Sequence, residues 1–507
     1  MDSIISIIPP IVIITLVIMT RKIVLSLGAG ILLSAILIEQ GHLLKSIENV
    51  LLAVIHVFYS DGTWNNGNLY VLSFLLLLGI LTAVISTLGG NRAFGMWIGK
   101  KIHTKRGAQL MTATCGISLF PDDVFNMFVT SQVAGPVIDH AKVPRTKLAY
   151  IIHSTSDPTC VLCPLSSWGA YIIAILTTIF ASLQLGENPL MAFMIIATTN
   201  FYAISTLLFV FSSAAFDINI GRMKQQTKQL PTDHIKSNPN GSIWELVIPI
   251  ALLAGGAISS MIVTGYRNSE TPSIVSIFAN SEVSFSLVTG AVIAVLASFA
   301  FYARQLKKQQ QNIKQLPSTL KKGMKTTLPA VEILLYAWVL SDFIGQLGTG
   351  NFLAGLMEEI TLPTAFLPFL LFLLTGAMAF ATGTSWGTFA VMLPIAAQIA
   401  QASDPGMMFY MMSAVLSGSL FGDHCSPVSD TTTVASAAAG CTQIEHVATQ
   451  LPYALICAGI TACSFLLLGL TQLKSIPYVF IVVIISCLIF YFRNRKKPIE
   501  ETTANIA

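Results

Sequence analysis

Long apolar runs, separated by short polar or basic segments, cover most of the 507-residue chain. Clear examples lie at residues 4–19, 23–38, 69–88, 243–264 and 283–302. A helix that crosses a bilayer needs about 20 predominantly apolar residues, so this pattern predicts membrane helices. Basic residues and then another apolar run follow the first run, which indicates a retained membrane helix rather than a cleaved signal peptide.

Basic residues in alternate loops predict the orientation of these helices, because Lys and Arg favour the cytoplasmic side. Arg21 and Lys22 place the first loop in the cytoplasm. The amphipathic stretch at residues 39–68 is then expected outside the membrane or on its surface. Counting onward predicts an all-α polytopic membrane protein with about 11 crossings and two re-entrant hairpins.

Two apolar segments have flanks that do not suit a simple crossing. Residues 109–139 begin and end beside basic loops, and Phe120-Pro121-Asp122-Asp123 interrupts them. About 12 to 15 apolar residues on each side are too few for two crossings, so we expect a hairpin that enters from the cytoplasm. A second hairpin, at residues 364–403, is expected to enter from outside.

Two further segments are long and carry polar interruptions. Residues 148–185 are interrupted at 154–158 and 164–169, and residues 406–440 are interrupted at 422–433. We expect both to be broken helices with unwound centres, because irregular backbone at membrane depth is tolerated only inside the protein or beside a watery cavity.

The order of hairpin, broken helix and returning helix occurs twice, with opposite sides of insertion. Inverted repeats with paired interruptions are typical of secondary transporters whose binding site lies near the midplane. The predicted division is 1–68 (N-terminal helices and external amphipathic stretch), 69–216 (first repeat), 217–327 (basic cytoplasmic loops and two linking helices), 328–473 (second repeat) and 474–507 (last helix and cytoplasmic tail).

Composition agrees with this class. The chain is 54% hydrophobic and 10% charged, whereas soluble domains carry about 25% charged residues. The net charge of +4 is modest and gives no reason to expect a nucleic-acid partner. The eight cysteines lie in or beside apolar runs, so we interpret them as buried thiols. We expect no cofactor apart from the transported ions.

Residues 422–433 combine two carboxylates, an imidazole and several hydroxyl groups between apolar flanks. Ionisable groups at membrane depth usually mark an ion or proton site. A Ser-Asp-x-Thr pattern occurs in both broken helices, and it can supply charged and neutral oxygen ligands for Na⁺. The candidate ion-binding residues of the two helices are Ser156, Asp157, Thr159, Asp423, His424, Ser429, Asp430, Thr431 and Thr432.

Asp430 is predicted to be the main carboxylate that Na⁺ and protons share, with Asp157 as its partner in Na⁺ binding. Asp122 and Asp123 are further candidates, although capping of the following helix is an alternative role for them. His424 could titrate near neutral pH, or it could donate a hydrogen bond to a carbonyl.

The two Trp-containing motifs are assigned to the support of the hairpins and the lining of the cavity. Their residues are Ser167, Trp168, Thr384, Ser385 and Trp386.

Several motifs together carry a family resemblance. They are Asp122-Asp123-x-Phe125, Ser167-Trp168-Gly169-Ala170-Tyr171, Gly383-Thr384-Ser385-Trp386-Gly387 and the block from Gly422 to Thr432. Across residues 70–460 the sequence resembles the NhaC-type sodium/proton antiporter family, within a superfamily of ion transporters that have re-entrant hairpins. The resemblance implies sodium- or proton-coupled transport more firmly than it implies a substrate.

The leading hypothesis is therefore a Na⁺/H⁺ antiporter in the bacterial inner membrane, with a homodimer as one arrangement. The alternative is a Na⁺- or H⁺-coupled carrier of a small organic anion or amino acid. An enzyme is disfavoured, because the chain has no His-Glu-x-x-His or Gly-x-Gly-Asp motif and Ser426 beside His424 is not a recognisable triad.

Overall fold

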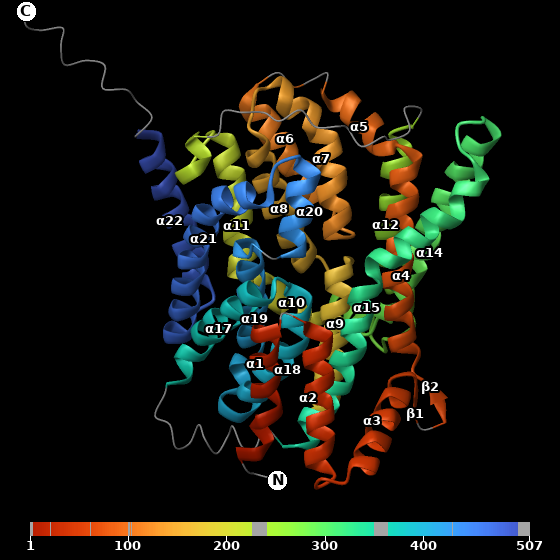
Figure 1. Cartoon of the computed structure of the whole chain (residues 1–507), viewed down its shortest axis with the longest axis vertical. Helices are drawn as coiled ribbons and strands as arrows, with labels where there is room; N and C mark the ends of the chain where they lie inside the picture. The colour runs from red at the N-terminus through yellow and green to blue at the C-terminus, as the bar shows by residue number, and fades with distance from the viewer. Residues whose placement is uncertain are drawn as a thin grey trace, which may run out of the picture.

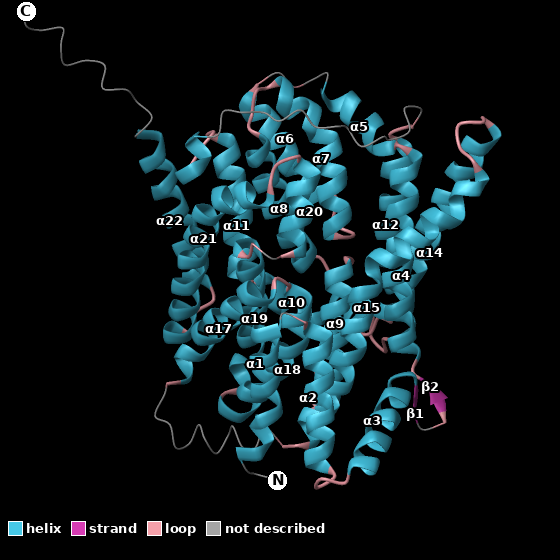
Figure 2. Ribbon diagram, viewed as in Figure 1, coloured by secondary structure: helices cyan, strands magenta, loops and turns pink. Residues whose placement is uncertain are grey.

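The computed structural model describes residues 4–20, 22–60, 62–99, 102, 104–225, 241–348, 363–427 and 429–494. Helices dominate this part of the chain (Figure 2), and one small antiparallel sheet pairs β1 (Tyr59–Ser60) with β2 (Thr63–Trp64). The amino-terminal elements are η1 (Ile4–Ile7), α1 (Ile8–Thr20), α2 (Ile23–Ile38), α3 (Leu43–Phe58), α4 (Asn66–Leu88) and α5 (Gly90–Gly99).

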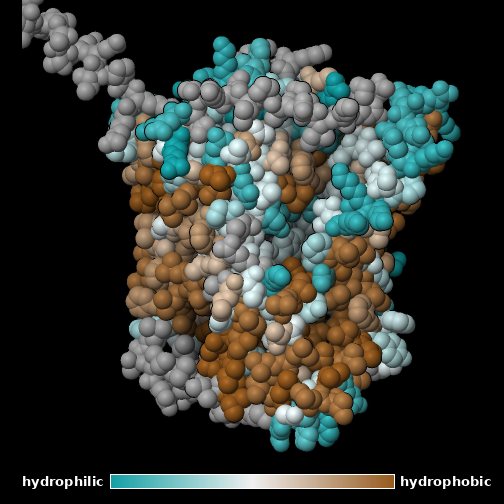
Figure 3. Space-filling view, in the orientation of Figure 1, coloured by the Kyte–Doolittle hydropathy of each residue, from teal (hydrophilic) through white to brown (hydrophobic). Residues whose placement is uncertain are grey.

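The predicted all-α polytopic architecture is confirmed. Among the described residues, eight helices are long and apolar enough to cross a membrane. The total becomes nine if the bent pair α10 (Pro189–Thr198) and α11 (Phe201–Ala215) forms one span. The 11 crossings stay a prediction, since α1 and α2 have only 13 and 16 residues. In Figure 3 a broad hydrophobic belt covers the visible face, with hydrophilic residues above and below it.

The first hairpin and the first broken helix are consecutive helix pairs. They comprise α6 (Lys105–Ser118), α7 (Asp123–His140), α8 (Arg145–Leu162) and α9 (Ser167–Ser182). The chain turns between α6 and α7 at residues 119–122, so that Asp122 ends the turn and Asp123 begins α7. The break between α8 and α9 covers residues 163–166.

The other predicted interruption, at residues 154–158, is wrong because α8 continues through it. The Thr155 hydroxyl donates to the carbonyl of Ile151 at 2.8 Å, one helical turn earlier, so this polar side chain is satisfied without unwinding. Pro158 lacks an N–H, which leaves the Ser154 carbonyl without its usual helical donor.

The second hairpin and the second broken helix follow the same order. They comprise η4 (Thr364–Phe366), α17 (Leu367–Thr382), α18 (Ser385–Ser403), η5 (Pro405–Met407), α19 (Met408–Cys425) and α20 (Asp430–Ala439). α17 ends at Gly383, whose φ of 71° is left-handed and suits glycine. The break between α19 and α20 lies at residues 426–429, of which Val428 is outside the described residues.

The two repeats pack into each other from opposite ends of the molecule. In Figure 1 the hairpin α6–α7 and the half-helix α20 lie in the upper half, while α17, α18 and the half-helix α9 lie lower. α20 packs against α7 and α8, and α9 packs against α18. The Arg145 guanidinium at the start of α8 also donates to the carbonyl of Ala439 at the end of α20, 3.2 Å away.

Glycines permit close contact between a hairpin arm and the broken helix of the same repeat. A Cβ added to Gly116 of α6 would lie 2.0 Å from the Thr155 hydroxyl of α8. A Cβ added to Gly422 of α19 would lie 2.3 Å from the carbonyl oxygen of Gly376 in α17. Small residues at such positions let membrane helices approach closely, so both repeats use the same packing device.

The remaining helices link and enclose the repeats. They are η2 (Gly221–Gln225), α12 (Trp244–Asn268), α13 (Ile274–Ala279), α14 (Val283–Lys307), η3 (Ile313–Gln315), α15 (Leu316–Gln346), α21 (Gln443–Thr471) and α22 (Ser475–Asn494). The helix predicted at residues 328–347 begins earlier, at Leu316, because Pro317 is compatible with a first helical turn. Lys321, Lys322 and Lys325 therefore lie on a helix rather than in a loop.

Candidate functional site

A buried cluster of histidine and aspartate side chains joins the two broken helices. His153 and Asp157 lie one turn apart on α8, and His424 lies near the end of α19. The Nε2 atoms of His153 and His424 are 3.2 and 3.6 Å from Oδ2 of Asp157. Asp157 has no exposed surface, so bulk water does not stabilise a negative charge on its carboxylate. The two imidazoles and the Ser156 hydroxyl, which lies 3.1 Å from its Oδ1, stabilise that charge instead.

Thr431 extends this cluster to a second buried carboxylate. Its hydroxyl lies 3.0 Å from Nε2 of His153 and donates to Oδ2 of Asp423 at 2.8 Å. Ser429, which caps α20, has its hydroxyl 2.9 Å from that of Thr431. One polar network therefore connects Asp157 of the first repeat with Asp423 of the second.

Gln450 and His446 of α21 complete the network. The Gln450 amide nitrogen donates to the carbonyl of His424 at 2.8 Å, so this atom is the NH₂ group. It also lies 3.0 Å from Nδ1 of His153, which must then accept, and this assigns the His153 proton to Nε2. His446 Nε2 lies 3.0 Å from the same Nδ1, and the Tyr202 hydroxyl lies 3.2 Å from Nδ1 of His424.

Several buried oxygen atoms in the broken helices have no hydrogen-bond partner among the described residues. They include Oδ2 of Asp157, Oδ1 of Asp423 and the hydroxyl oxygens of Thr159 and Thr432. Buried polar atoms are nearly always paired, and a hard cation such as Na⁺ would satisfy oxygen atoms of this kind. Both broken helices thus supply oxygen atoms that a bound cation could use.

The first hairpin presents two acidic residues to this region. Oδ1 of Asp122 accepts from the backbone N–H of Phe125 at 3.0 Å, which confirms the capping role for this residue. Its other oxygen accepts from Ser167 at the start of α9, 3.1 Å away. Asp122 and Asp123 are both buried and lie within electrostatic reach of Asp157.

Asp430 occupies a different position from Asp423. It is the first residue of α20, its side chain is exposed, and its Oδ1 accepts from the backbone N–H of Thr431 at 2.9 Å. It lies within electrostatic reach of Asp157. The structure therefore connects Asp423, rather than Asp430, to Asp157 through Thr431 and His153, and the predicted leading role of Asp430 stays a prediction.

The Trp-containing motifs lie where the second hairpin meets α9 and α19. The Ser385 hydroxyl donates to the carbonyl of Ser419 at 3.2 Å, and Tyr171 donates to the carbonyl of Trp386 at 3.0 Å. The rings of Trp168 and Trp386 are 5.7 Å apart. Thr384 precedes the first residue of α18. These contacts agree with a supporting position for the motifs.

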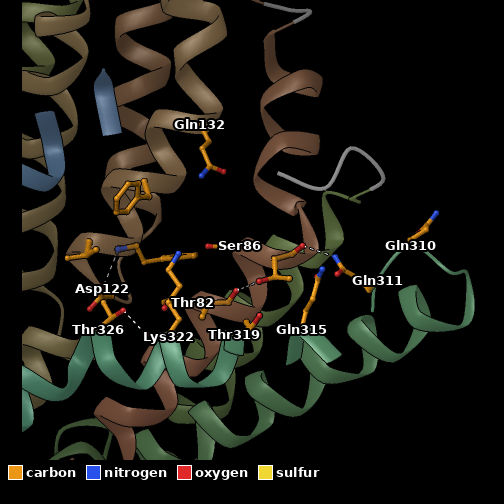
Figure 4. Close-up of a pocket in the computed structure, with 15 residues that line it drawn as sticks. Thr82, Ser86, Asp122, Gln132, Gln310, Gln311, Gln315, Thr319, Lys322 and Thr326 are labelled. Atoms are coloured by element: carbon orange, nitrogen blue, oxygen red, sulfur yellow. Dashed lines mark hydrogen bonds between the residues drawn. The ribbon is translucent and has the colours of Figure 1, made fainter. Parts of the chain in front are cut away.

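A polar cleft leads to the tip of the first hairpin. It has a volume of about 600 Å³ and lies between α4, α7 and α15. Figure 4 shows Lys322 and Thr326 of α15 extending toward the end of α7 that carries Asp122. Glutamine side chains, including Gln132 and Gln315, supply further hydrogen-bonding groups. Asp122 therefore contacts the buried region through Ser167 and also lines this cleft.

Sequence reasoning missed several residues of the network. It gave no role to His446, Gln450 or Tyr202, and it gave no expectation of the 48° bend between α10 and α11. His446 and Gln450 lie in the polar first turns of α21, beside Glu445, so the hydropathy pattern gave no signal for them. For the bend, the signal was Asn200, which caps α11.

The fold and this buried site define a polytopic membrane protein built like a secondary transporter. A model of the Na⁺/H⁺ antiporter family matches residues 159–470, which is more than half of the chain. The chain therefore belongs to the Na⁺/H⁺ antiporter family.

Relatives extend this comparison. An uncharacterized protein of Haemophilus influenzae is 36% identical over 97% of this chain and 96% of its own length. The malate-2H⁺/Na⁺-lactate antiporter of Bacillus subtilis is 34% identical over 31% of this chain and 33% of its own. An uncharacterized Na⁺/H⁺ antiporter of H. influenzae is 38% identical over 17% of this chain and 19% of its own.

Two solved transporters share the fold. The crystal structure of YdaH from Alcanivorax borkumensis covers 84% of this chain and 89% of its own, with a TM-score of 0.58 and 13% identity. The structure of MtrF from Neisseria gonorrhoeae covers 85% of each chain, with a TM-score of 0.51 and 15% identity. At these identities the likeness concerns the fold alone.

Proposed function

We propose that this protein exchanges Na⁺ for H⁺ across the inner membrane of a bacterium by alternating access. The observation that carries the proposal is the buried network of Asp157 and Asp423, one carboxylate from each broken helix. Membership of the Na⁺/H⁺ antiporter family supports it. A secondary transporter also accounts for the cluster without assigning a catalytic nucleophile to Ser426.

Na⁺ and protons would compete for the same carboxylates. Two carboxylates in one dry site cannot both remain charged without a counter-charge, so each needs either a proton or a cation. The donor-free oxygens of Asp423, Thr159 and Thr432 would suit Na⁺, and Asp430 at the start of α20 would add charge beside them. His153 and His424 contact Asp157, so a proton that binds to this carboxylate would lie beside both imidazoles.

A test of this proposal is Na⁺-driven proton flux in reconstituted vesicles. An imposed Na⁺ gradient should move protons in the opposite direction through the wild-type protein, and removal of Na⁺ should stop the flux. A matched control is His140→Gln, since His140 is exposed at the end of α7, away from the network. Proton flux that does not depend on Na⁺ would contradict the proposal.

A second candidate function is coupled transport of a small organic anion or amino acid. The cleft of about 600 Å³ favours it, because Lys322 could contact a carboxylate while glutamine and threonine side chains bind polar groups. A relative named as a malate-2H⁺/Na⁺-lactate antiporter is compatible with this candidate. An organic acid that changes Na⁺ flux in the same vesicles, with an effect lost in Lys322→Ala, would support it.

A further inference from the structure

The buried cluster of His153, Asp157 and His424 contains more nitrogen than a Na⁺ site needs. Each of the three residues offers one ligand atom, and these atoms lie within 4.8 Å of one another. Na⁺ prefers oxygen, whereas imidazole nitrogen suits Zn²⁺ and related transition metals. We propose that this cluster binds a divalent transition-metal cation of the Zn²⁺ class and that the bound metal blocks ion exchange.

The spacing of the ligand atoms agrees with such a site. Zn²⁺ bonds to imidazole nitrogen and carboxylate oxygen at about 2.0 to 2.1 Å, so tetrahedral ligands lie about 3.3 Å apart. Oδ2 of Asp157 is 3.2 Å from Nε2 of His153 and 3.6 Å from Nε2 of His424. Two edges of the tetrahedron are thus already near the required length, and the third, between the two histidine nitrogens, is no longer than 4.8 Å.

Two of the three ligand atoms have no hydrogen-bond partner, whereas the third, Nε2 of His153, lies 3.0 Å from the Thr431 hydroxyl. Oδ2 of Asp157 and Nε2 of His424 make no hydrogen bond, although both residues are essentially fully buried. Their close approaches are to each other and, for Asp157, to His153. A cation between them would compensate the buried carboxylate and occupy both lone pairs.

The second ring nitrogen of each histidine has a partner that would orient it as a ligand. Nδ1 of His424 lies 3.2 Å from the Tyr202 hydroxyl, whose oxygen can accept a hydrogen bond from Nδ1–H. For Nε2 of His153 to bind a metal, its proton must move to Nδ1, which can then donate to Nε2 of His446, 3.0 Å away. The Gln450 amide meanwhile keeps its bond to the carbonyl of His424. Metal-binding histidines almost always donate their other N–H in this way. The Thr431 hydroxyl, 3.0 Å from Nε2 of His153, is a candidate for the fourth ligand.

This proposal rests on the proposed function in one respect only. Zn²⁺ can reach the buried cluster only when alternating access opens it to one side of the membrane. Metal binding itself can be measured without transport. The probe is Zn²⁺, offered in Na⁺-free buffer to chelator-treated, tag-free protein in detergent, with bound metal counted by mass spectrometry. Wild-type protein should bind one equivalent through this cluster.

Two variants and one control assign the metal to these residues. His424→Gln and Asp157→Asn should each lower Zn²⁺ affinity by at least about tenfold, since loss of an outer partner alone costs that much. His140→Gln, which alters an exposed histidine, should leave the affinity unchanged. Absence of Zn²⁺ from the wild type, or unchanged affinity in both site variants, would overturn the proposal.

If the variants fail to fold, X-ray absorption of the Zn²⁺-loaded wild type decides the matter. Two imidazoles and at least one oxygen at about 2.0 to 2.1 Å are expected, and sulfur or a single imidazole would refute the assignment. In vesicles, Zn²⁺ should abolish exchange by the wild type, and a chelator should restore it. Exchange that continues with the site loaded would refute the block, whereas a wild type without any exchange would refute only the proposed function.

Discussion

The two broken helices deliver one carboxylate each to the same network, but they do so in different ways. Asp157 lies within the continuous part of α8, more than one turn before the break at residues 163–166, and His153 holds it from the preceding turn. Asp423 lies in the last turn of α19, and Thr431 reaches it from beyond the break. Regular helix geometry therefore positions the first acid, whereas the broken backbone itself positions the second.

The hairpin tips differ in charge as well. The first tip carries Asp122 and Asp123, while the second carries Thr384 and Ser385. Asp122 faces both Ser167 and the polar cleft, so the first tip can attract a cation that enters there. Ser385 instead donates to a backbone carbonyl. The repeats thus share their packing but divide the chemistry unequally, with acidic residues in three of the four interrupted segments.

The largest effect should come from removing either buried carboxylate charge. A hydrogen bond to a charged group is worth about 1.5 to 3 kcal/mol, so Asp157→Asn and Asp423→Asn should each reduce Na⁺-driven proton flux by about 10- to 100-fold. The measurement is flux per inserted molecule in vesicles. If only one variant loses exchange, the two helices do not share a single site.

Packing between hairpin arm and broken helix should be the next most sensitive feature. Overpacking costs about 1 to 3 kcal/mol, and Gly422→Ala should reach the upper part of that range because its new Cβ would meet a backbone carbonyl. Gly116→Ala should cost less, since its nearest neighbour is a side-chain hydroxyl.

Thermal unfolding in detergent measures this difference. Gly459→Ala provides the control, because a Cβ there would meet no atom within 4 Å. Equal losses of stability in all three variants would show that the close helix contacts do not matter.

The hairpin tips should respond unequally to loss of a hydroxyl. Ser167→Ala removes a donor to the Asp122 carboxylate and should cost about 1.5 to 3 kcal/mol of stability, against about 1 kcal/mol for Ser385→Ala, whose acceptor is a carbonyl. Chemical unfolding of the two variants in parallel tests this order. A greater loss of stability in Ser385→Ala than in Ser167→Ala would contradict the expected order of the two hairpin tips.

Asp430 should show the smallest effect among the acidic residues of the broken helices. Exposed charges contribute about 0.2 to 1 kcal/mol, so Asp430→Asn should raise the Na⁺ concentration for half-maximal exchange by no more than about fivefold. The measurement is the Na⁺ dependence of flux in Asp430→Asn and, in parallel, in Asp423→Asn, which shows which of the two carboxylates exchange depends on more strongly. Complete loss of exchange in Asp430→Asn would restore the leading role that the sequence pattern predicted for it.

The sequence by itself determined the membrane class, the helical architecture and the position of most backbone interruptions. Hydropathy and charge are local properties, so they located the turn at Asp122, the break near Ser166 and, within the wider predicted interruption at 422–433, the break at residues 426–429. The same local reasoning failed at residues 154–158, because it could not show that the Thr155 hydroxyl is satisfied by a carbonyl of its own helix.

Only the tertiary structure decided which side chains meet. His446, Gln450 and Tyr202 come from helices outside the two broken ones, and they reach the network because α11 and α21 pack against α8 and α19. Whether Asp423 or Asp430 joins Asp157 depends on the direction in which α20 leaves the break. The packing of α20 against α7 and α8 fixes that direction, and this packing is a property of the assembly rather than of any single segment.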